Sequence, residues 1–242
     1  MARTDAPAGA DPGDPPAQTA PPTPPHTTTS AAPYLRWLAV MAAAYAITHH
    51  TGVALAWLGS IGQTRWADWI DLLTPYAVLL PAAAALHRGQ AARHHWALYL
   101  AGALTYVEGH GIHLSANSVG NVAPSDIAHL WDEYVGHYLW YGGVTLVFTA
   151  LAAALARRPA ATGVLAPALA VLTGLTYTTN ALEGQTALAS IAVSAAFTAW
   201  GWTTRHRLGR LLLIAFAPAL LMLITYGIWH GGFPEPTELG WI

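Results

Sequence analysis

Histidine and acidic side chains gather in one stretch of this chain. Six of the side chains between residues 106 and 137 are the main candidates for metal binding or proton transfer: Glu108, His110, His113, Asp132, Glu133 and His137. Neutral imidazole and carboxylate groups together suit zinc, iron, copper or manganese. The chain has no cysteine, which excludes disulfides, thiolate ligands and a cysteine nucleophile.

The spacing of the first group predicts one shared helix face. Tyr106, His110 and His113 are four and three residues apart, and Asn117 follows after four more. On a helix these intervals stack the side chains in one stripe, whereas Glu108 points elsewhere.

The second group predicts a facing stripe on the next helix. Glu133 and His137 are four residues apart, His129 precedes Glu133 by the same interval, and Asp132 lies one turn from His129. Because a short connection joins the two segments, we expect them to be antiparallel neighbours whose stripes face each other.

These patterns predict a divalent metal site. The expected ligands are His110, His113, His137 and His230, with Glu108, Asp132 or Glu133 as acid/base groups or further ligands. Zinc is the expected metal, and iron and copper are alternatives. The sequence lacks the His-Glu-x-x-His pattern of zinc proteases.

Composition indicates a lipid-embedded protein. Hydrophobic residues make up 54% of the chain and charged residues only 9%, with 11 Trp and 10 Tyr, which suits a membrane body with interfacial aromatic belts. The chain has no lysine and only 10 basic residues, so a nucleic-acid surface is not expected.

Apolar segments of about 20 residues, the length that crosses a bilayer, recur along most of the chain. Residues 1–33, rich in Pro, Ala and Thr, predict a disordered tail. Residues 34–232 predict an all-α membrane domain, and residues 233–242 a short extracytoplasmic tail. The domain is predicted to be a bundle of seven transmembrane helices at residues 34–59, 69–87, 96–116, 127–156, 162–184, 186–204 and 211–231.

The arginines predict the orientation of this bundle. Nine of the ten fall in the N-terminal tail or in segments that share one side, and only Arg65 lies opposite. By the positive-inside rule that side is cytoplasmic. We therefore expect a cytoplasmic N-terminus, an extracytoplasmic C-terminus and a location in the plasma membrane.

Most histidine and acidic side chains then fall on the extracytoplasmic side. Within a span such groups cost several kcal/mol unless they face a wet cavity, pair with each other or bind a ligand, so their clustering predicts a functional pocket. The set comprises seven of the 12 histidines and nine of the 12 acidic residues: His49, His50, His110, His113, His129, His137, His230, Asp68, Asp71, Glu108, Asp126, Asp132, Glu133, Glu183, Glu235 and Glu238.

Several members of this set have two interpretations. His49 and His50 are either a structural pair bonded to nearby backbone or ligands, and His129 is either a ligand or a surface residue at a helix start. Glu183 is either a proton acceptor or a solvated span end. The tail from residue 229 onward either folds over the pocket as a lid or frays.

Four residues resemble part of a known family pattern. The alkaline-ceramidase-like seven-span hydrolases carry a His, a downstream acidic pair and further His in the last span, and His113, Asp132, Glu133 and His230 are similar to that pattern. The resemblance implies a zinc amidase. This chain has one His in its seventh predicted span where that family has two, and its serines follow His113 rather than precede it.

The expected function is a membrane-embedded, metal-dependent enzyme, a hydrolase that acts on a lipid-like substrate. Membrane lipids and an amphipathic small molecule are the expected partners. One alternative is a His-rich di-metal oxidoreductase resembling the membrane desaturases and hydroxylases, although the outward-facing site argues against a cytoplasmic electron supply. Others are a proton or metal transporter or channel, in which the same groups form a relay, and a metal-free cyclase.

Overall fold

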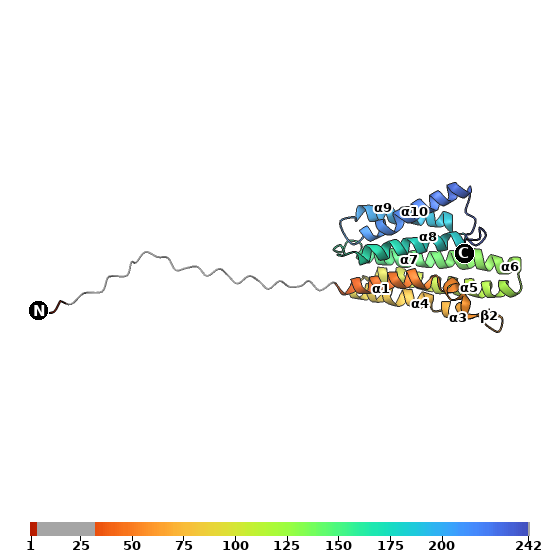
Figure 1. Ribbon diagram of the computed structural model, residues 1–242, viewed down its shortest axis with the longest axis horizontal. Coiled ribbons are helices and arrows are strands. Elements are labelled where there is room, and N and C mark those ends of the chain that lie inside the picture. The colour runs from red at the N-terminus through yellow and green to blue at the C-terminus, as the bar shows by residue number, and fades with distance from the viewer. Residues whose placement is uncertain (4–31, 242) are drawn as a thin grey trace. The chain divides into compact units, whose positions relative to one another are not determined.

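Helices form most of the body of the protein (Figure 1). The computed structural model describes residues 1–3 and 32–241, so most of the predicted N-terminal tail lies outside the described residues. The long helices are α1 (Pro33–Thr48), α4 (Thr74–Arg88), α5 (Arg93–Val122), α7 (His137–Leu155), α8 (Leu165–Glu183), α9 (Ala187–Thr203) and α10 (Arg210–His230). The short elements are α2 (Thr51–Ala54), η1 (Ala56–Leu58), β1 (Ser60–Ile61), β2 (Thr64–Arg65), α3 (Trp66–Asp71), α6 (Asp126–His129) and the π-helix η2 (Leu130–Gly136).

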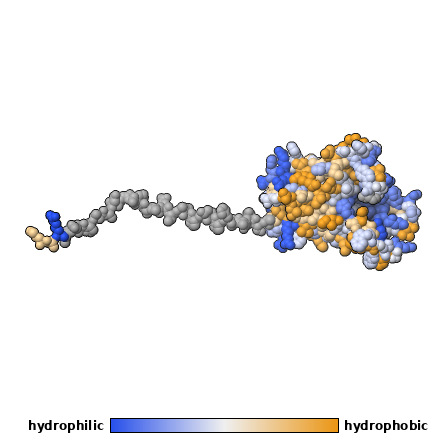
Figure 2. Space-filling model, in the orientation of Figure 1, coloured by the Kyte–Doolittle hydropathy of each residue, from blue (hydrophilic) through white to orange (hydrophobic). Residues whose placement is uncertain are grey.

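Three helical segments are long and apolar enough to cross a membrane. They are Trp66–Arg88 with 23 residues, Asp126–Leu155 with 30 and Arg210–His230 with 21. Helix α9 is apolar but shorter. Figure 2 shows hydrophobic residues over the middle of the body and hydrophilic residues toward both ends. These features are compatible with an integral membrane protein.

The first predicted span, residues 34–59, is shorter than expected because α1 ends at Thr48. The Thr48 carbonyl accepts hydrogen bonds from the hydroxyls of Thr51 at 2.6 Å and Thr74 at 3.1 Å. Side chains thus satisfy a carbonyl that a longer helix would bond to its own backbone. The chain then runs through the β1–β2 hairpin, whose turn contains Gly62 at φ 62°.

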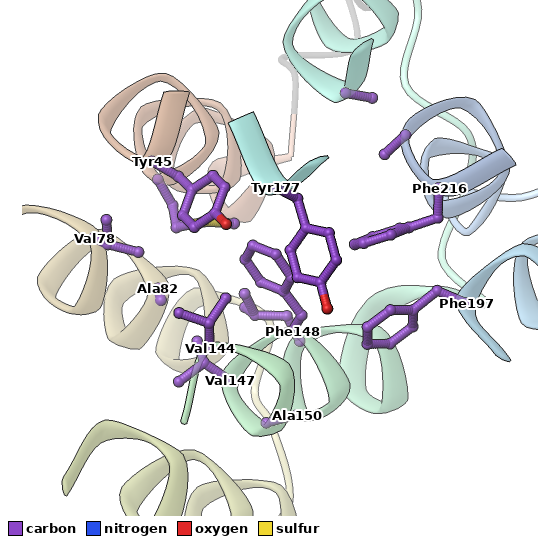
Figure 3. Close-up of a cluster of buried hydrophobic side chains, with 14 of the residues drawn as sticks. Tyr45, Val78, Ala82, Val144, Val147, Phe148, Ala150, Tyr177, Phe197 and Phe216 are labelled. Carbon is purple, nitrogen blue, oxygen red and sulfur yellow. The ribbon is translucent and has the colours of Figure 1, made fainter. Parts of the chain in front are cut away.

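A ladder of aromatic rings forms the centre of the core and joins five helices (Figure 3). Tyr45 of α1 contacts Phe148 of α7, with ring centroids 5.2 Å apart. Phe216 of α10 contacts Phe148, Tyr177 of α8 and Phe197 of α9 at 6.2, 5.4 and 4.7 Å. Tilted and edge-to-face contacts at these distances are favourable for aromatic pairs.

Glycines let α5 and α7 approach closely. A Cβ atom added at Gly109 would lie 2.2 Å from the Trp140 backbone nitrogen, and one at Gly143 would lie 2.3 Å from the Tyr106 nitrogen. Small residues at such crossings allow backbone contact between membrane helices. These two helices carry four of the seven predicted metal-binding or acid/base residues, namely Glu108, His110, His113 and His137.

The bundle has two chemically different ends. At the arginine end, the α4–α5, α7–α8 and α9–α10 connections are bonded together: Arg158 Nη2 donates to the Gly89 carbonyl at 2.7 Å, and the Leu208 nitrogen donates to the Arg158 carbonyl at 2.9 Å. At the histidine end, α5 finishes, α6 begins and α8 finishes (Figure 1).

Candidate metal centre

Three side chains at the histidine end come close enough to share one metal ion. One ligand atom each from His113 of α5, Asp132 of η2 and His137 of α7 all lie within 4.8 Å of one another. The exposed fractions of these side chains are 17%, 14% and 7%, so little water surrounds them. The structure therefore brings together three of the residues that the sequence analysis proposes as metal ligands or acid/base groups.

Both imidazoles turn Nδ1 toward a carboxylate. His113 Nδ1 donates a hydrogen bond to Asp132 Oδ1 at 2.6 Å. His137 Nδ1 lies 3.0 Å from Glu133 Oε2, within ion-pair distance, but the angles do not make a hydrogen bond. The two rings are 4.3 Å apart. The carboxylate at His137 Nδ1 leaves Nε2 of that ring as a ligand nitrogen, a usual arrangement of metal-binding histidines. Asp132, by contrast, is itself a member of the ligand group with His113.

The π-helix η2 carries both carboxylates. Ser125 Oγ accepts a hydrogen bond from the Ala128 nitrogen at 3.2 Å and caps the start of this segment. Residues 130–136 then adopt the wider i→i+5 pattern, which often occurs at functional sites. Asp132 and Glu133 are adjacent in sequence, yet each reaches a different histidine.

The α8–α9 turn closes one side of His137. A Cβ atom added at Gly184 would lie 2.8 Å from the His137 Cδ2 atom, so any larger residue would press on the ring. The next residue, Gln185, has a φ of 49° and accepts a hydrogen bond from the Tyr138 hydroxyl at its carbonyl. The turn is therefore held against the helix that carries His137.

The C-terminal tail folds back onto this turn. Gln185 Nε2 donates to Glu235 Oε1 at 2.6 Å, and the Thr237 hydroxyl donates to Glu183. Tyr226 donates from its hydroxyl to the Pro234 carbonyl at 2.7 Å. Of the two alternatives for the tail, a folded segment therefore describes residues 233–241 better than a frayed one.

Trp140 lies at the centre of a ring of four histidines. Its indole centroid is 5.5 Å from His49, 4.7 Å from His110, 5.3 Å from His113 and 5.6 Å from His137. Trp140 is buried, and it follows His137 by three residues on the same helix face. Its packing restricts the positions that these imidazoles can take.

A second polar network lies next to this ring. His49 Nδ1 donates to the Tyr45 carbonyl at 2.9 Å, so its Nε2 accepts from the Tyr106 hydroxyl at 2.7 Å. His110 Nε2 donates to the Asp71 carbonyl at 3.0 Å. Both ring nitrogens of His49 therefore have hydrogen-bond partners, which favours the structural interpretation of this residue over a ligand role.

The other sequence candidates lie apart from the metal group. The His110 ring is 6.2 Å from that of His113 and is engaged by Asp71. His230 ends α10 and packs on Tyr226, with centroids 4.5 Å apart. Glu108 is exposed on α5, and His129 is exposed on α6. The described residues form one three-member ligand group, and these four side chains are not in it.

Sequence reasoning missed the parts played by Trp140 and Asp71. The signal for Trp140 was its three-residue interval from His137, which places both on one helix face. No sequence signal marked the Asp71 main-chain carbonyl as the partner of His110, because that contact depends on how α3 and α4 return to the bundle.

Exposed aromatic residues alternate with the candidate ligands. Trp131, Tyr134 and Tyr138 are exposed beside Asp132, Glu133 and His137, and Trp66, Trp69 and Trp241 are also exposed at this end. Trp and Tyr concentrate where a membrane meets water. In a membrane, this arrangement would put the metal group near the interface rather than at the bilayer centre.

No protein-family model, curated protein or solved structure matches this chain. The similarity to the alkaline-ceramidase-like hydrolases therefore extends only to the isolated residues described above.

Proposed function

We propose that this protein is a membrane-embedded, metal-dependent hydrolase whose metal is held by His113, His137 and Asp132. The observation that carries the proposal is a group of two neighbouring imidazoles and one carboxylate, whose ligand atoms all lie within 4.8 Å of one another. A buried group of this kind is costly as simple packing and is explained if it holds a cation.

The number of ligands favours catalysis over a purely structural metal. Structural zinc sites usually close with four protein ligands, whereas catalytic sites have three and leave one position for water or substrate. The described residues offer three such groups. Imidazole nitrogen and carboxylate oxygen suit zinc, with iron or copper as alternatives.

Glu133 is the proposed proton carrier. A bound divalent metal lowers the pKa of its water to about 7 and so supplies a nucleophile at neutral pH. The buried Glu133 Oε2 lies 3.0 Å from His137 Nδ1, forms no hydrogen bond among the described residues and can accept a proton. Glu133 would take the proton from water as the water oxygen bonds to the acyl carbon, and return it to the leaving oxygen or nitrogen as the acyl bond breaks.

A lipid-like substrate fits the position of the site. The exposed aromatic residues around the metal group indicate the depth of the membrane–water interface. At that depth an acyl chain can enter from the lipid side, while water reaches the metal from outside. The acyl linkage of a membrane lipid lies in the same layer.

Seven membrane spans with a cytoplasmic N-terminus form part of this proposal. Its support is the difference in charge between the two ends. Among residues 32–241, only one arginine, Arg65, lies at the histidine end. The arginine end carries Arg36 at the start of α1 and, at or beside its connections, Arg88, Arg93, Arg157, Arg158, Arg205, Arg207 and Arg210. By the positive-inside rule, the metal group would face the extracytoplasmic side.

The test uses zinc-loaded protein reconstituted with a fluorogenic long-chain acyl ester and the corresponding amide. We expect hydrolysis of at least one, and a loss of about 100-fold or more in Glu133→Gln with zinc still bound. The matched control is Asp126→Asn, an exposed carboxylate of α6, which should keep wild-type turnover. Equal turnover by wild type and Glu133→Gln would contradict the role of Glu133.

A second function is favoured by the same ligand set. Two histidines and one carboxylate also form the site of mononuclear non-haem iron oxygenases. That alternative requires bound iron and turnover that stops without oxygen and reductant. Transport of metal or protons into sealed vesicles, with no change to any substrate, would contradict both enzymatic proposals.

A further inference from the structure

A separate feature of the protein is an apolar cavity of about 350 Å³ at the arginine end. It lies between α1, α7, α8 and α10, near the starts of α1, α8 and α10 and the finish of α7. Alanines such as Ala39, Ala42, Ala166 and Ala170 make up much of its wall. Because an alanine fills little volume, their clustering leaves a space that larger side chains would close.

Hydrogen bonds fix the end wall of this cavity. The Gly209 nitrogen donates to the Ala156 carbonyl at 2.8 Å, and Arg210 donates from its guanidinium to the Ala161 carbonyl. Gly209, Ala156 and Ala161 all line the cavity. The space is therefore bounded by bonded connections rather than by loose loops.

Arginines lie beside this cavity. Among its lining side chains in the described part of the protein, Arg36 alone is charged, and it is exposed at the rim. Arg157, Arg207 and Arg210 each lie next in sequence to a lining residue. No Asp or Glu occurs in residues 138–182 or 186–234, so nothing acidic in those stretches offsets these charges.

We propose that the cavity binds one acyl chain of a phospholipid with an anionic headgroup, and that Arg36 contacts its phosphate. The volume lies within the roughly 300–1,000 Å³ of ligand pockets. An apolar space of this kind is poorly suited to water and gains dispersion contacts from a hydrocarbon guest. A guanidinium binds phosphate with paired hydrogen bonds, and the nearby arginines add attraction for an anionic headgroup.

The ligand is tested by native mass spectrometry of protein purified in micelles with equal amounts of phosphatidylglycerol and phosphatidylcholine. Wild type should retain one phosphatidylglycerol in preference to phosphatidylcholine. Ala39→Phe and Ala166→Phe, which fill the cavity, should each lower retention of both lipids. Arg36→Gln should lower retention of phosphatidylglycerol about 10-fold, as expected for one lost charge-assisted hydrogen bond to its phosphate.

Two substitutions serve as matched controls. Ala101→Phe adds the same ring to an exposed position of α5, and Arg88→Gln removes an exposed arginine that does not line the cavity. Both should retain lipid as wild type does. Phosphatidylglycerol should also raise the thermal midpoint of wild type but not of the two cavity-filled variants.

Three results would overturn this site. They are equal retention of the two phospholipids by wild type, unchanged retention by a folded cavity-filled variant, and retention of free fatty acid in place of phospholipid. If neither phenylalanine variant folds, the Arg36→Gln comparison decides the question, because unchanged retention of phosphatidylglycerol in that exposed-site variant contradicts the phosphate contact.

Discussion

Asp132, which contacts His113, should control metal affinity. Asp132→Asn keeps the size of the side chain but removes the negative charge of a proposed metal ligand. Replacing such a carboxylate typically costs 10- to 100-fold in affinity, so a loss of about that size is expected. Competition with a zinc-binding dye measures it, and unchanged affinity would contradict Asp132 as a ligand.

Residue spacing predicted two of the side-chain contacts at the candidate site. The four-residue interval joined Glu133 to His137, and the antiparallel neighbours joined His113 to Asp132. The same spacing offered His110 as a ligand, but its ring bonds to a main-chain carbonyl. Such carbonyls have no sequence signature, so spacing alone could not separate His110 from His113.

At the scale of helices, the close crossing of α5 and α7 should control whether the metal ligands meet. Gly109→Ala adds a Cβ atom that would lie 2.2 Å from the Trp140 nitrogen, whereas Gly111→Ala on the same helix meets nothing within 4 Å. Overpacking of this kind costs about 1–3 kcal/mol. We expect Gly109→Ala to lower both the thermal midpoint and the zinc content.

Gly111→Ala is the matched control for that crossing. Alanine is about 0.5–1 kcal/mol more favourable than glycine inside a helix, so this variant should be as stable as wild type or slightly more so. Equal behaviour of the two variants in thermal unfolding and zinc content would show that helix separation does not govern the site.

The docked C-terminal tail should loosen as pH rises. Burial raises the pKa of Glu235 above its ordinary 4.5, Glu133, Glu238 and Glu183 raise it further, and the hydrogen bond from Gln185 opposes them. The docked tail therefore holds a proton on Glu235 more tightly than the free tail does. Docking is strongest below pH 4.5 and weakens as the pH rises from 4.5 through the raised pKa of Glu235.

A dye attached at the C-terminus reports this change through its fluorescence anisotropy. Anisotropy should fall as pH rises from 4.5 toward neutrality, and Glu235→Gln should remove most of the dependence. A wild-type signal that stays constant over this range would mean that Glu235 does not govern docking.

Helix positions were easier to predict than their interruptions. Each predicted apolar segment overlaps one long helix, because a run of apolar residues marks such a segment directly. The end of α1 at Thr48 depends on a hydroxyl from Thr74, far along the chain, and the π-helix at Leu130–Gly136 replaces the regular period on which the stripe at His129 relied. Neither is visible in local periodicity.

At the scale of the whole molecule, the number of spans decides where the candidate metal centre faces. With seven spans and a cytoplasmic arginine end, a C-terminal reporter that is active only in the cytoplasm should stay silent. The same reporter inserted in the α9–α10 connection should be active. Activity at the C-terminus would contradict the odd span count and place the histidine end inside the cell.

The metal content of purified wild-type protein and matched histidine variants tests the central claim most directly. The proposed site predicts one zinc per chain, with a loss of about 10-fold or more in His113→Ala and in His137→Ala. His129→Ala, an exposed histidine of α6, should keep wild-type metal content. Folded, active wild-type protein without metal, or the same metal content in all three variants, would contradict the proposed metal centre.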